Sequence, residues 1–480
     1  MPGTQPLENK NLKNAAKATI ALLLVLLAGA VIFYKERMLF IDAPHMLFRI
    51  INEGHLQIEE YRYGSFISQI LPLCGVWLHL PFRLLVILYS AGFYLFYLSV
   101  ALLLVYKFRN YSLAILMGLY FTLFVSDTYY WPNNEVHQGI GWLFLAFALC
   151  FHVAFRKRPF VVTLAVFTAS FYLAIWTHPL VMLVAVYLWF FYWSDKAQWP
   201  FSMLQSFILT TILLLLSYCK FHQGMHHGYD SCKIEIVTGF SLHKIGTIIA
   251  SPQLRFFVKS CITNYWLFVV VFVAGLIGLL KEKKYLLFTW TVLFVTGYVL
   301  LVFIVFPGVQ TNRFYIESEY MPLSVIASAP FVYYVLPKLS GKITLLVLVS
   351  IFSIRLVYIY NSAQYFTARV AIMEKMKEKM KEKNLTHIII PDPGGATDSA
   401  LIMNWAAPVE SIMLSKLDNE DPQRTFIFAD PGQVSYYLNT GKDTFLGNWE
   451  KRPVQLINSY YFQLDTGSAY QLVSFDYLMQ

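Results

Sequence analysis

Acidic and arginine side chains gather just after the first apolar run of this 480-residue chain, although only 14% of its residues are charged. The stretch FIDAPHMLFRIINEGHLQIEEYRYG contains Asp42, Glu59, Glu60, Arg62 and Tyr63. A carboxylate can act as a general base or bind a metal ion, and an arginine can hold a phosphate through two parallel hydrogen bonds. Charges at membrane depth are costly and are usually kept for function. We therefore interpret these residues as candidates for a functional site.

Later loops add further candidates of the same chemical kinds. The sequences YYWPNNEVHQGIGW, WTHPL and NRFYIESEY contribute Glu135, His137, His178, Arg313, Tyr315 and Glu317. Arg313 is the only basic residue in the short loops that we place outside the membrane. It is therefore the main candidate for binding a phosphate.

Each candidate also has an ordinary structural interpretation. Asp42 precedes Ala43 and Pro44, which is typical of a helix N-cap. Glu59 and Glu60 could form a solvated turn paired with Arg62. Glu135 suits the start of a helix, and His178 suits a tight polar turn. Glu317 could simply neutralise Arg313, and these alternatives stay open at the level of sequence.

A second long outer segment contains KFHQGMHHGYDSCK, with three histidines close together. His222 and His226 have the i, i+4 spacing of a metal site on a helix. Gly224 and Gly228 should interrupt such a helix, so we predict a surface loop. The five cysteines show no metal-binding spacing, and we expect unpaired thiols, although a disulfide among Cys219, Cys232 and Cys261 stays open.

The elements that position these residues are long apolar segments. Hydrophobic residues make up 57% of the chain, and runs able to cross about 30 Å of hydrocarbon recur along residues 1–360. Eleven segments predict eleven helical spans, near residues 18–34, 82–106, 112–125, 139–155, 160–176, 179–193, 203–219, 265–280, 285–306, 321–336 and 343–360. The first resembles a signal peptide, but we favour an uncleaved anchor. Within residues 35–81, two amphipathic helices should lie in the membrane interface.

The short loops set the orientation of the spans. With the N-terminus in the cytoplasm, fourteen Lys and Arg residues lie on the inner side and only Arg313 lies in the short outer loops. This places the C-terminal tail outside the cytoplasmic membrane. The tail, residues 361–480, begins with a helix bearing a stripe of Met373, Met376 and Met380. THIIIPDPGGATDSALIMNW and RTFIFADPGQVSYYL then each predict a strand, a turn and a helix, so the tail is a small α/β domain.

The order of these parts resembles the GT-C class of integral membrane glycosyltransferases, which includes protein mannosyltransferases and aminoarabinose transferases. The likeness covers about residues 1–360 and comprises FIDAPHML, EEYRYGSFISQILPL, the YYWPNNEVHQGIGW loop, the WTHPL turn and NRFYIESEYMPLSVIASAP. Members of that class carry an Asp-Glu or Asp-x-Asp pair where this chain has Asp42 followed by alanine. The resemblance therefore leaves the use of a divalent cation, Mg²⁺ or Mn²⁺, open.

This resemblance implies an inner-membrane glycosyltransferase that moves a sugar from a polyprenyl-phosphate donor to an extracytoplasmic glycan, lipid or protein. Asp42, Glu59 and Glu60 would be the catalytic carboxylates, and Arg62, Tyr63, Glu135, His137, His178, Arg313, Tyr315 and Glu317 would contact substrates. Two other classes stay open: a transporter or flippase of lipid-linked glycans, and a non-catalytic scaffold or sensor. Much of the positive charge behind the net charge of +9 lies in the short loops that we place on the inner side of the membrane. We therefore expect no nucleic-acid partner.

Overall fold

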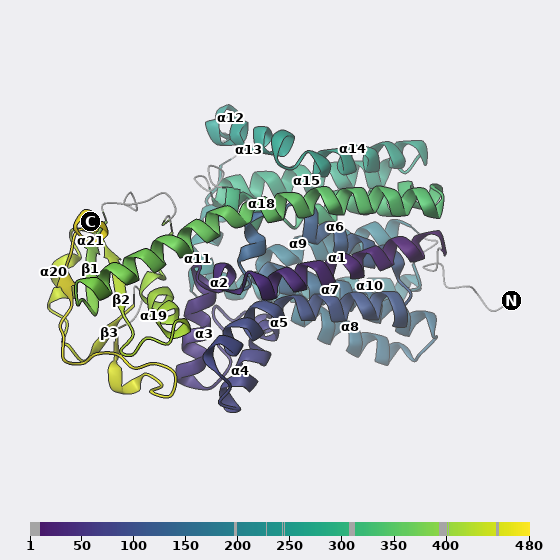
Figure 1. Cartoon of the computed structure of the whole chain (residues 1–480). Helices are drawn as coiled ribbons and strands as arrows, with labels where there is room; N and C mark the ends of the chain where they lie inside the picture. Colours follow the sequence, from purple (N-terminus) through teal and green to yellow (C-terminus); the bar gives the residue numbers. More distant parts are fainter. Residues whose placement is uncertain are drawn as a thin grey trace.

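A computed structural model gives the arrangement of the chain. It describes residues 10–195, 199–226, 228–241, 243, 245–306, 313–392, 401, 403–447 and 451–480. The described chain is mostly helical, with a helical bundle at one end and a small α/β domain at the other (Figure 1).

The helices of the bundle follow one another with short connections. Up to His226 they are η1 (Lys10–Leu12), α1 (Lys13–Ile32), α2 (Tyr34–Met38), α3 (Asp42–Glu53), η2 (Tyr63–Gln69), α4 (Ile70–Trp77), α5 (Phe82–Leu102), η3 (Leu103–Lys107), α6 (Tyr111–Leu123), η4 (Asp127–Tyr130), α7 (Glu135–Phe155), α8 (Phe160–Ile175), α9 (Pro179–Ser194) and α10 (Met203–His226). Then come α11 (Tyr229–Thr238), α12 (Ile245–Ala250), α13 (Pro252–Thr263), α14 (Trp266–Lys281), α15 (Tyr285–Val305), α16 (Arg313–Tyr320), α17 (Leu323–Pro330), η7 (Phe331–Val335), η8 (Leu336–Lys338) and α18 (Gly341–Glu382).

The chain is a multi-pass membrane protein by the length and hydropathy of its helices. Among the described residues, six helices are long and apolar enough to cross a bilayer, or eight if each of two bent helix pairs is one span. Three shorter apolar helices, α6, α8 and α9, accompany them. Each of the eleven segments expected from the sequence falls on one of these helices.

Residues 35–81 contain the two expected helical stretches. Helix α3 has a strongly one-sided apolar face, with Met46, Leu47, Ile50 and Ile51 buried. It ends at Gly54, whose left-handed φ of 70° suits a residue without a side chain, as the sequence predicted. The second stretch starts as the 3₁₀ turn η2 and continues as α4.

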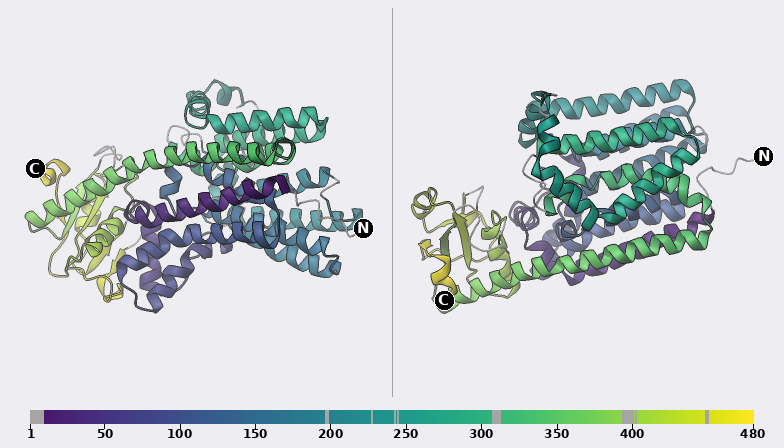
Figure 2. Two further views of the ribbon diagram at one scale, coloured as in Figure 1. Left: turned by 45° about the vertical axis from the view of Figure 1, so that its right-hand side comes forward. Right: turned by 90° about the horizontal axis from the view of Figure 1, so that it is seen from above.

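The last span and the start of the tail form one helix. Helix α18 has 42 residues and runs along the bundle and on into the C-terminal domain (Figures 1 and 2). Met373, Met376 and Met380 are all buried, which confirms the expected stripe. Lys377 pairs with Asp418 and Glu420 of the domain, so it lies against the domain and not in solvent.

The C-terminal domain is built on a small parallel sheet. Its elements are β1 (His387–Pro391), α19 (Ala407–Leu417), β2 (Thr425–Ala429), α20 (Val434–Leu438), β3 (Thr444–Leu446), β4 (Lys451–Pro453), η10 (Val454–Leu456), β5 (Gln471–Leu472) and α21 (Phe475–Met479). The strand order is β2-β1-β5, with His387 opposite Thr425, and β3 pairs with β4 antiparallel. Both predicted strands are confirmed, whereas the turn and helix expected after the first lie outside the described residues.

Two large hydrophobic cores hold the described chain together. One fills the helical bundle. The other joins α3 and the start of α5 to the methionine stripe of α18 and to β1, β2 and α19. The C-terminal domain therefore shares a core with residues 38–51, and this contact fixes the backbone next to Asp42.

Candidate functional site

A polar cavity of about 390 Å³ lies where residues 41–62 meet α7, α11 and α16. The C-terminal domain contributes Met403 and Trp405 to its wall. The lining residues are Ile41, Asp42, Met46, Glu59, Glu60, Arg62, Trp131, Asn133, Asn134, Glu135, Val136, His178, Tyr229, Lys233, Phe314, Tyr315, Ser318, Glu319, Met403 and Trp405.

Seven of the residues singled out from the sequence share this cavity. They are Asp42, Glu59, Glu60, Arg62, Glu135, His178 and Tyr315, contributed by five separate parts of the chain. Tyr63, His137, Arg313 and Glu317 do not line it. The fold therefore gathers most of the predicted carboxylates in one place.

Asp42 is the first residue of α3 and is partly buried in the cavity wall. The N-cap position of α3 is occupied by Ile41, which makes no side-chain capping bond, so the structure does not support the capping interpretation of Asp42. Burial and the neighbouring carboxylates of Glu135 and Glu59 raise the pKa of Asp42 to about 7. A carboxyl group with such a pKa can accept a proton near neutral pH.

Ion pairs fix the carboxylates and arginines around Asp42. Arg62 lies 3.3 Å from Glu135 and 3.1 Å from Asp230, and both partners raise the pKa of its guanidinium against the effect of burial. Arg49 lies 2.5 Å from Glu59. The Glu60 carboxylate accepts a hydrogen bond of 2.9 Å from the backbone of Tyr229. Arg62 is thus neutralised by two acids, and its charge serves to hold the wall together.

Lys233 supplies a cation on the same wall that the sequence analysis missed. Its ammonium lies over the rings of Tyr229 and Phe306, at 3.7 and 4.5 Å. Burial lowers the pKa of Lys233, and Glu319 opposes that shift. The KFHQGMHHGYDSCK segment contains Lys220, Asp230 and Lys233, but its sequence pointed only to the histidines as candidate ligands. The pairing of Asp230 with Arg62 depends on contacts between distant segments, which residue spacing does not reveal.

An apolar cavity of about 210 Å³ adjoins the polar one. The two share His178, Lys233 and Glu319 in their walls. The rest of the apolar cavity is formed by α9, α10, α11 and α15, including Leu183, Phe221, Leu301, Val302 and Val305. Lys220 and Asp230 also line it, so cationic and acidic groups lie where the apolar and polar spaces meet.

His178 lies between the two cavities as a neutral imidazole. Burial, together with the nearby cations Arg62, Lys233 and Lys220, lowers its pKa well below the usual value. Its Nδ1 accepts a hydrogen bond of 3.2 Å from the backbone of Leu180, which caps α9. The proton of the neutral ring is therefore on Nε2, which makes that nitrogen a donor.

Arg313 occupies a different position from the one expected for a phosphate clamp. Its guanidinium donates two hydrogen bonds to Asp127, and a third, of 3.1 Å, to Ser362. Nearby Glu317 is fully buried and accepts hydrogen bonds from the backbone of Ser126 and Thr128 and from Tyr265. Both residues tie α16 to the turn at η4 and lie outside the lining of the polar cavity, and their role in binding substrate stays a prediction.

The two remaining candidates also lie apart from the cavity. His137 is buried among Phe93, Tyr97, Tyr120 and Phe121, with its ring stacked on Phe121 at 5.2 Å. Tyr63 is exposed and contacts the ring of Tyr61. Packing in an aromatic core explains His137, and nothing in the structure assigns Tyr63 a role.

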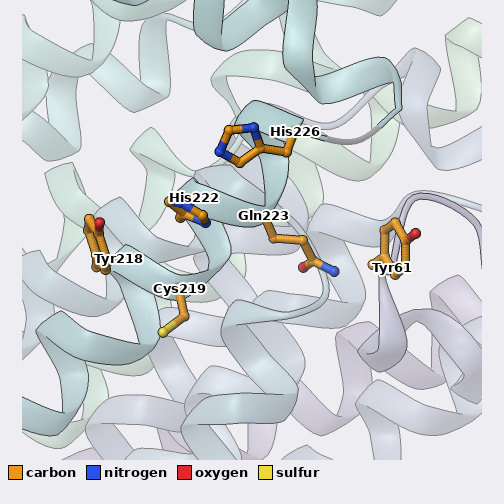
Figure 3. A pocket seen from close by; sticks show the side chains of 6 residues that line it. All are labelled: Tyr61, Tyr218, Cys219, His222, Gln223 and His226. Atoms are coloured by element: carbon orange, nitrogen blue, oxygen red, sulfur yellow. The ribbon is translucent and has the colours of Figure 1, made fainter.

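The histidine segment forms a helix where we expected a loop. Helix α10 continues through Gly224 to His226, because it packs on α11 and so tolerates the glycine. His222 and His226 lie one turn apart on that helix, and their ring centres are 4.6 Å apart. Both line an open pocket together with Cys219 (Figure 3). Among the described residues, no three His, Cys, Asp or Glu side chains are placed to hold a metal ion, and all five cysteines are unpaired.

No family model, curated protein or solved structure matches the chain. The two adjoining cavities are therefore the basis for inferring a function.

Proposed function

We propose that this protein is a membrane glycosyltransferase that moves a sugar from a polyprenyl-phosphate donor to an acceptor on the outer face of the cytoplasmic membrane. The observation that carries the proposal is the polar cavity containing Asp42, joined through His178, Lys233 and Glu319 to an apolar cavity among membrane helices. An apolar space that ends in cations suits an isoprenoid chain with a phosphate at its end.

In this proposal the phosphate binds at the junction of the two cavities. Lys220 and Lys233 line the apolar cavity and supply positive charge, and His178 supplies a neutral donor. Away from the junction the polar cavity carries four carboxylates, from Asp42, Glu59, Glu60 and Glu135, against the cation of Arg62, whereas at the junction Lys220 and Lys233 balance Asp230 and Glu319. This acidic wall repels a phosphate, so the phosphate stays at the junction and the sugar enters the polar cavity.

Asp42 acts as the general base in the proposed reaction. An acceptor hydroxyl attacks C1 of the sugar, the bond from C1 to the phosphate oxygen breaks, and the oxygen leaves with the electron pair as polyprenyl phosphate. Asp42 takes the hydroxyl proton, and its pKa of about 7 suits that task at neutral pH. A single displacement at C1 inverts the anomeric centre. The indoles of Trp131 and Trp405 provide flat surfaces on which sugar rings can stack.

The membrane arrangement in this proposal has eleven spans with the N-terminus in the cytoplasm. The six long helices, α14, the α17 segment and the three shorter apolar helices supply them. Helix α13 meets α14 at 85°, which supports a position in the plane of the outer interface. The C-terminal domain and the start of α1 lie at opposite ends of the bundle, which supports an outer location for the domain (Figure 2).

The proposal is tested by the release of polyprenyl phosphate. Purified protein in nanodiscs is incubated with a panel of polyprenyl-phosphate sugars, and free polyprenyl phosphate is quantified. We expect release with at least one sugar and a decrease of at least tenfold in Asp42→Asn, because the base is lost. Asp430→Asn, an exposed carboxylate of the C-terminal domain, is the matched control. Equal release by Asp42→Asn and the control would exclude Asp42 as the base.

A further inference from the structure

A buried ion pair of the C-terminal domain contacts the backbone that leads into Asp42. Glu410 of α19 and Arg369 of α18 lie 2.6 Å apart, and their side chains are 0% and 3% exposed. The second carboxylate oxygen of Glu410 accepts a hydrogen bond of 2.9 Å from the backbone N–H of Ile41. Arg369 donates to the carbonyl of Leu39 at 3.3 Å and lies over the ring of Phe40. The pair thus contacts all three residues that precede Asp42.

The backbone held by this pair is strained. Ile41 has φ 47° and ψ −115°, a conformation that favours glycine and is unfavourable for a β-branched residue. Strained conformations of this kind persist only where the surroundings impose them. Ile41 itself is 2% exposed, and its N–H is bound by Glu410. Without that hydrogen bond, the preceding peptide is free to rotate toward a relaxed conformation, and α3 would begin with Asp42 in another direction.

From this arrangement we infer that Glu410 is a positioning residue that holds Asp42 in the cavity through the backbone of Ile41. The C-terminal domain then helps to position the proposed catalytic base, in addition to any role in binding the acceptor. This inference deepens the proposed function and rests on it where turnover is concerned. The contact between Glu410 and Ile41 can also be tested without any turnover.

The test that is independent of function measures amide hydrogen exchange in peptides covering residues 39–46, with the full-length protein in nanodiscs. Glu410→Gln should increase the exchange rate of the Ile41 amide at least tenfold. Glu410→Asp keeps a negative charge for Arg369 but withdraws the carboxylate by one methylene, and it should give a smaller increase in the same peptide. Glu374→Gln is the matched control, since Glu374 lies on α18, as Arg369 does, and pairs with Lys35 of α2. Unchanged exchange in both Glu410 variants would overturn the inference.

The test that depends on function uses Ile41→Gly, which removes the strain. We expect Glu410→Gln to lower kcat for polyprenyl phosphate release at least tenfold, with KM for the donor changed less than twofold. In the Ile41→Gly background the same substitution should lower kcat less than threefold. Equal losses in both backgrounds would mean that Glu410 only supports folding, and the inference would be wrong. If the unsubstituted protein releases no polyprenyl phosphate, the proposed function fails, and the exchange measurement still decides the role of Glu410.

Discussion

Arg313 donates two hydrogen bonds to the carboxylate of Asp127, and this ion pair lies beside the polar cavity and not in it. The sequence pointed to Arg313 as the phosphate clamp because it was the only cation of the short outer loops. The fold places Lys220 of α10 and Lys233 of α11 in the wall of the apolar cavity, at the site that we propose for the phosphate. Variants of Lys233 and Arg313 should therefore differ in donor binding and in stability.

Lys233→Ala should raise KM for the polyprenyl-phosphate donor at least fivefold and leave the melting temperature within about 2 °C, because the lysine contributes charge to the junction. Arg313→Ala should have the opposite profile. It leaves Asp127 without its partner and lowers the free energy of unfolding by about 2 kcal/mol, while KM changes less than twofold. Donor titrations and thermal melts of both variants check this. A raised KM in Arg313→Ala alone would restore the interpretation drawn from the sequence.

The pH dependence of turnover should report Asp42. A base must be ionised, so kcat should rise with pH and level off above the Asp42 pKa of about 7. Glu59→Gln removes one of the charges that raise this pKa, so the midpoint should move to lower pH by about half a unit. Glu420→Gln in the C-terminal domain serves as the control. A midpoint that is the same in Glu59→Gln and in unsubstituted protein would show that another group titrates.

The raised pKa of Asp42 also predicts how stability changes with pH. Its usual pKa is 3.8, so between that value and about 7 the folded state binds more protons than the unfolded state, and stability falls as pH rises through this window. Ionised Asp42 therefore destabilises the fold at pH 8, by up to roughly 4 kcal/mol. Asp42→Asn should raise the melting temperature at pH 8 and lose that advantage as the pH falls to 4. A variant less stable than unsubstituted protein at pH 8 would contradict the assignment.

The apolar cavity makes a prediction about the length of the donor lipid. Val305→Trp should fill much of its volume of about 210 Å³ and raise KM for long-chain donors at least tenfold. A water-soluble donor with a very short isoprenoid should be affected less than threefold, since it does not need the cavity. Leu215→Trp, on an exposed face of α10, is the matched control. Equal effects on long and short donors would argue against a lipid-binding role.

The sequence predicted local features of this fold well. The apolar segments, the glycine that ends α3, the methionine stripe and the strands at 387–391 and 425–429 all depend on neighbouring residues and on simple periodicity. The candidate site was predicted in part, because Asp42, Glu59, Glu60, Arg62 and Glu135 are unusual charges next to apolar runs, and such charges are visible in a sequence.

The remaining features required three-dimensional contacts. Lys233 lines the cavity because α11 folds back beside residues 60–62, and Asp230 pairs with Arg62 across that contact. Glu410 contacts Ile41 although 369 positions separate them. Gly224 was expected to break a helix, but packing against α11 overrode its low helix propensity. Spacing within a segment carries no information about such distant pairs.

The central claim is that one substrate occupies both adjoining cavities, and a structure of the protein with a bound polyprenyl-phosphate sugar tests it most directly. The account predicts the isoprenoid chain among α9, α10, α11 and α15, the phosphate within hydrogen-bonding distance of Lys233 and His178, and the sugar facing Asp42. A donor bound elsewhere, with its phosphate on Arg313 or its sugar remote from Asp42, would contradict the account.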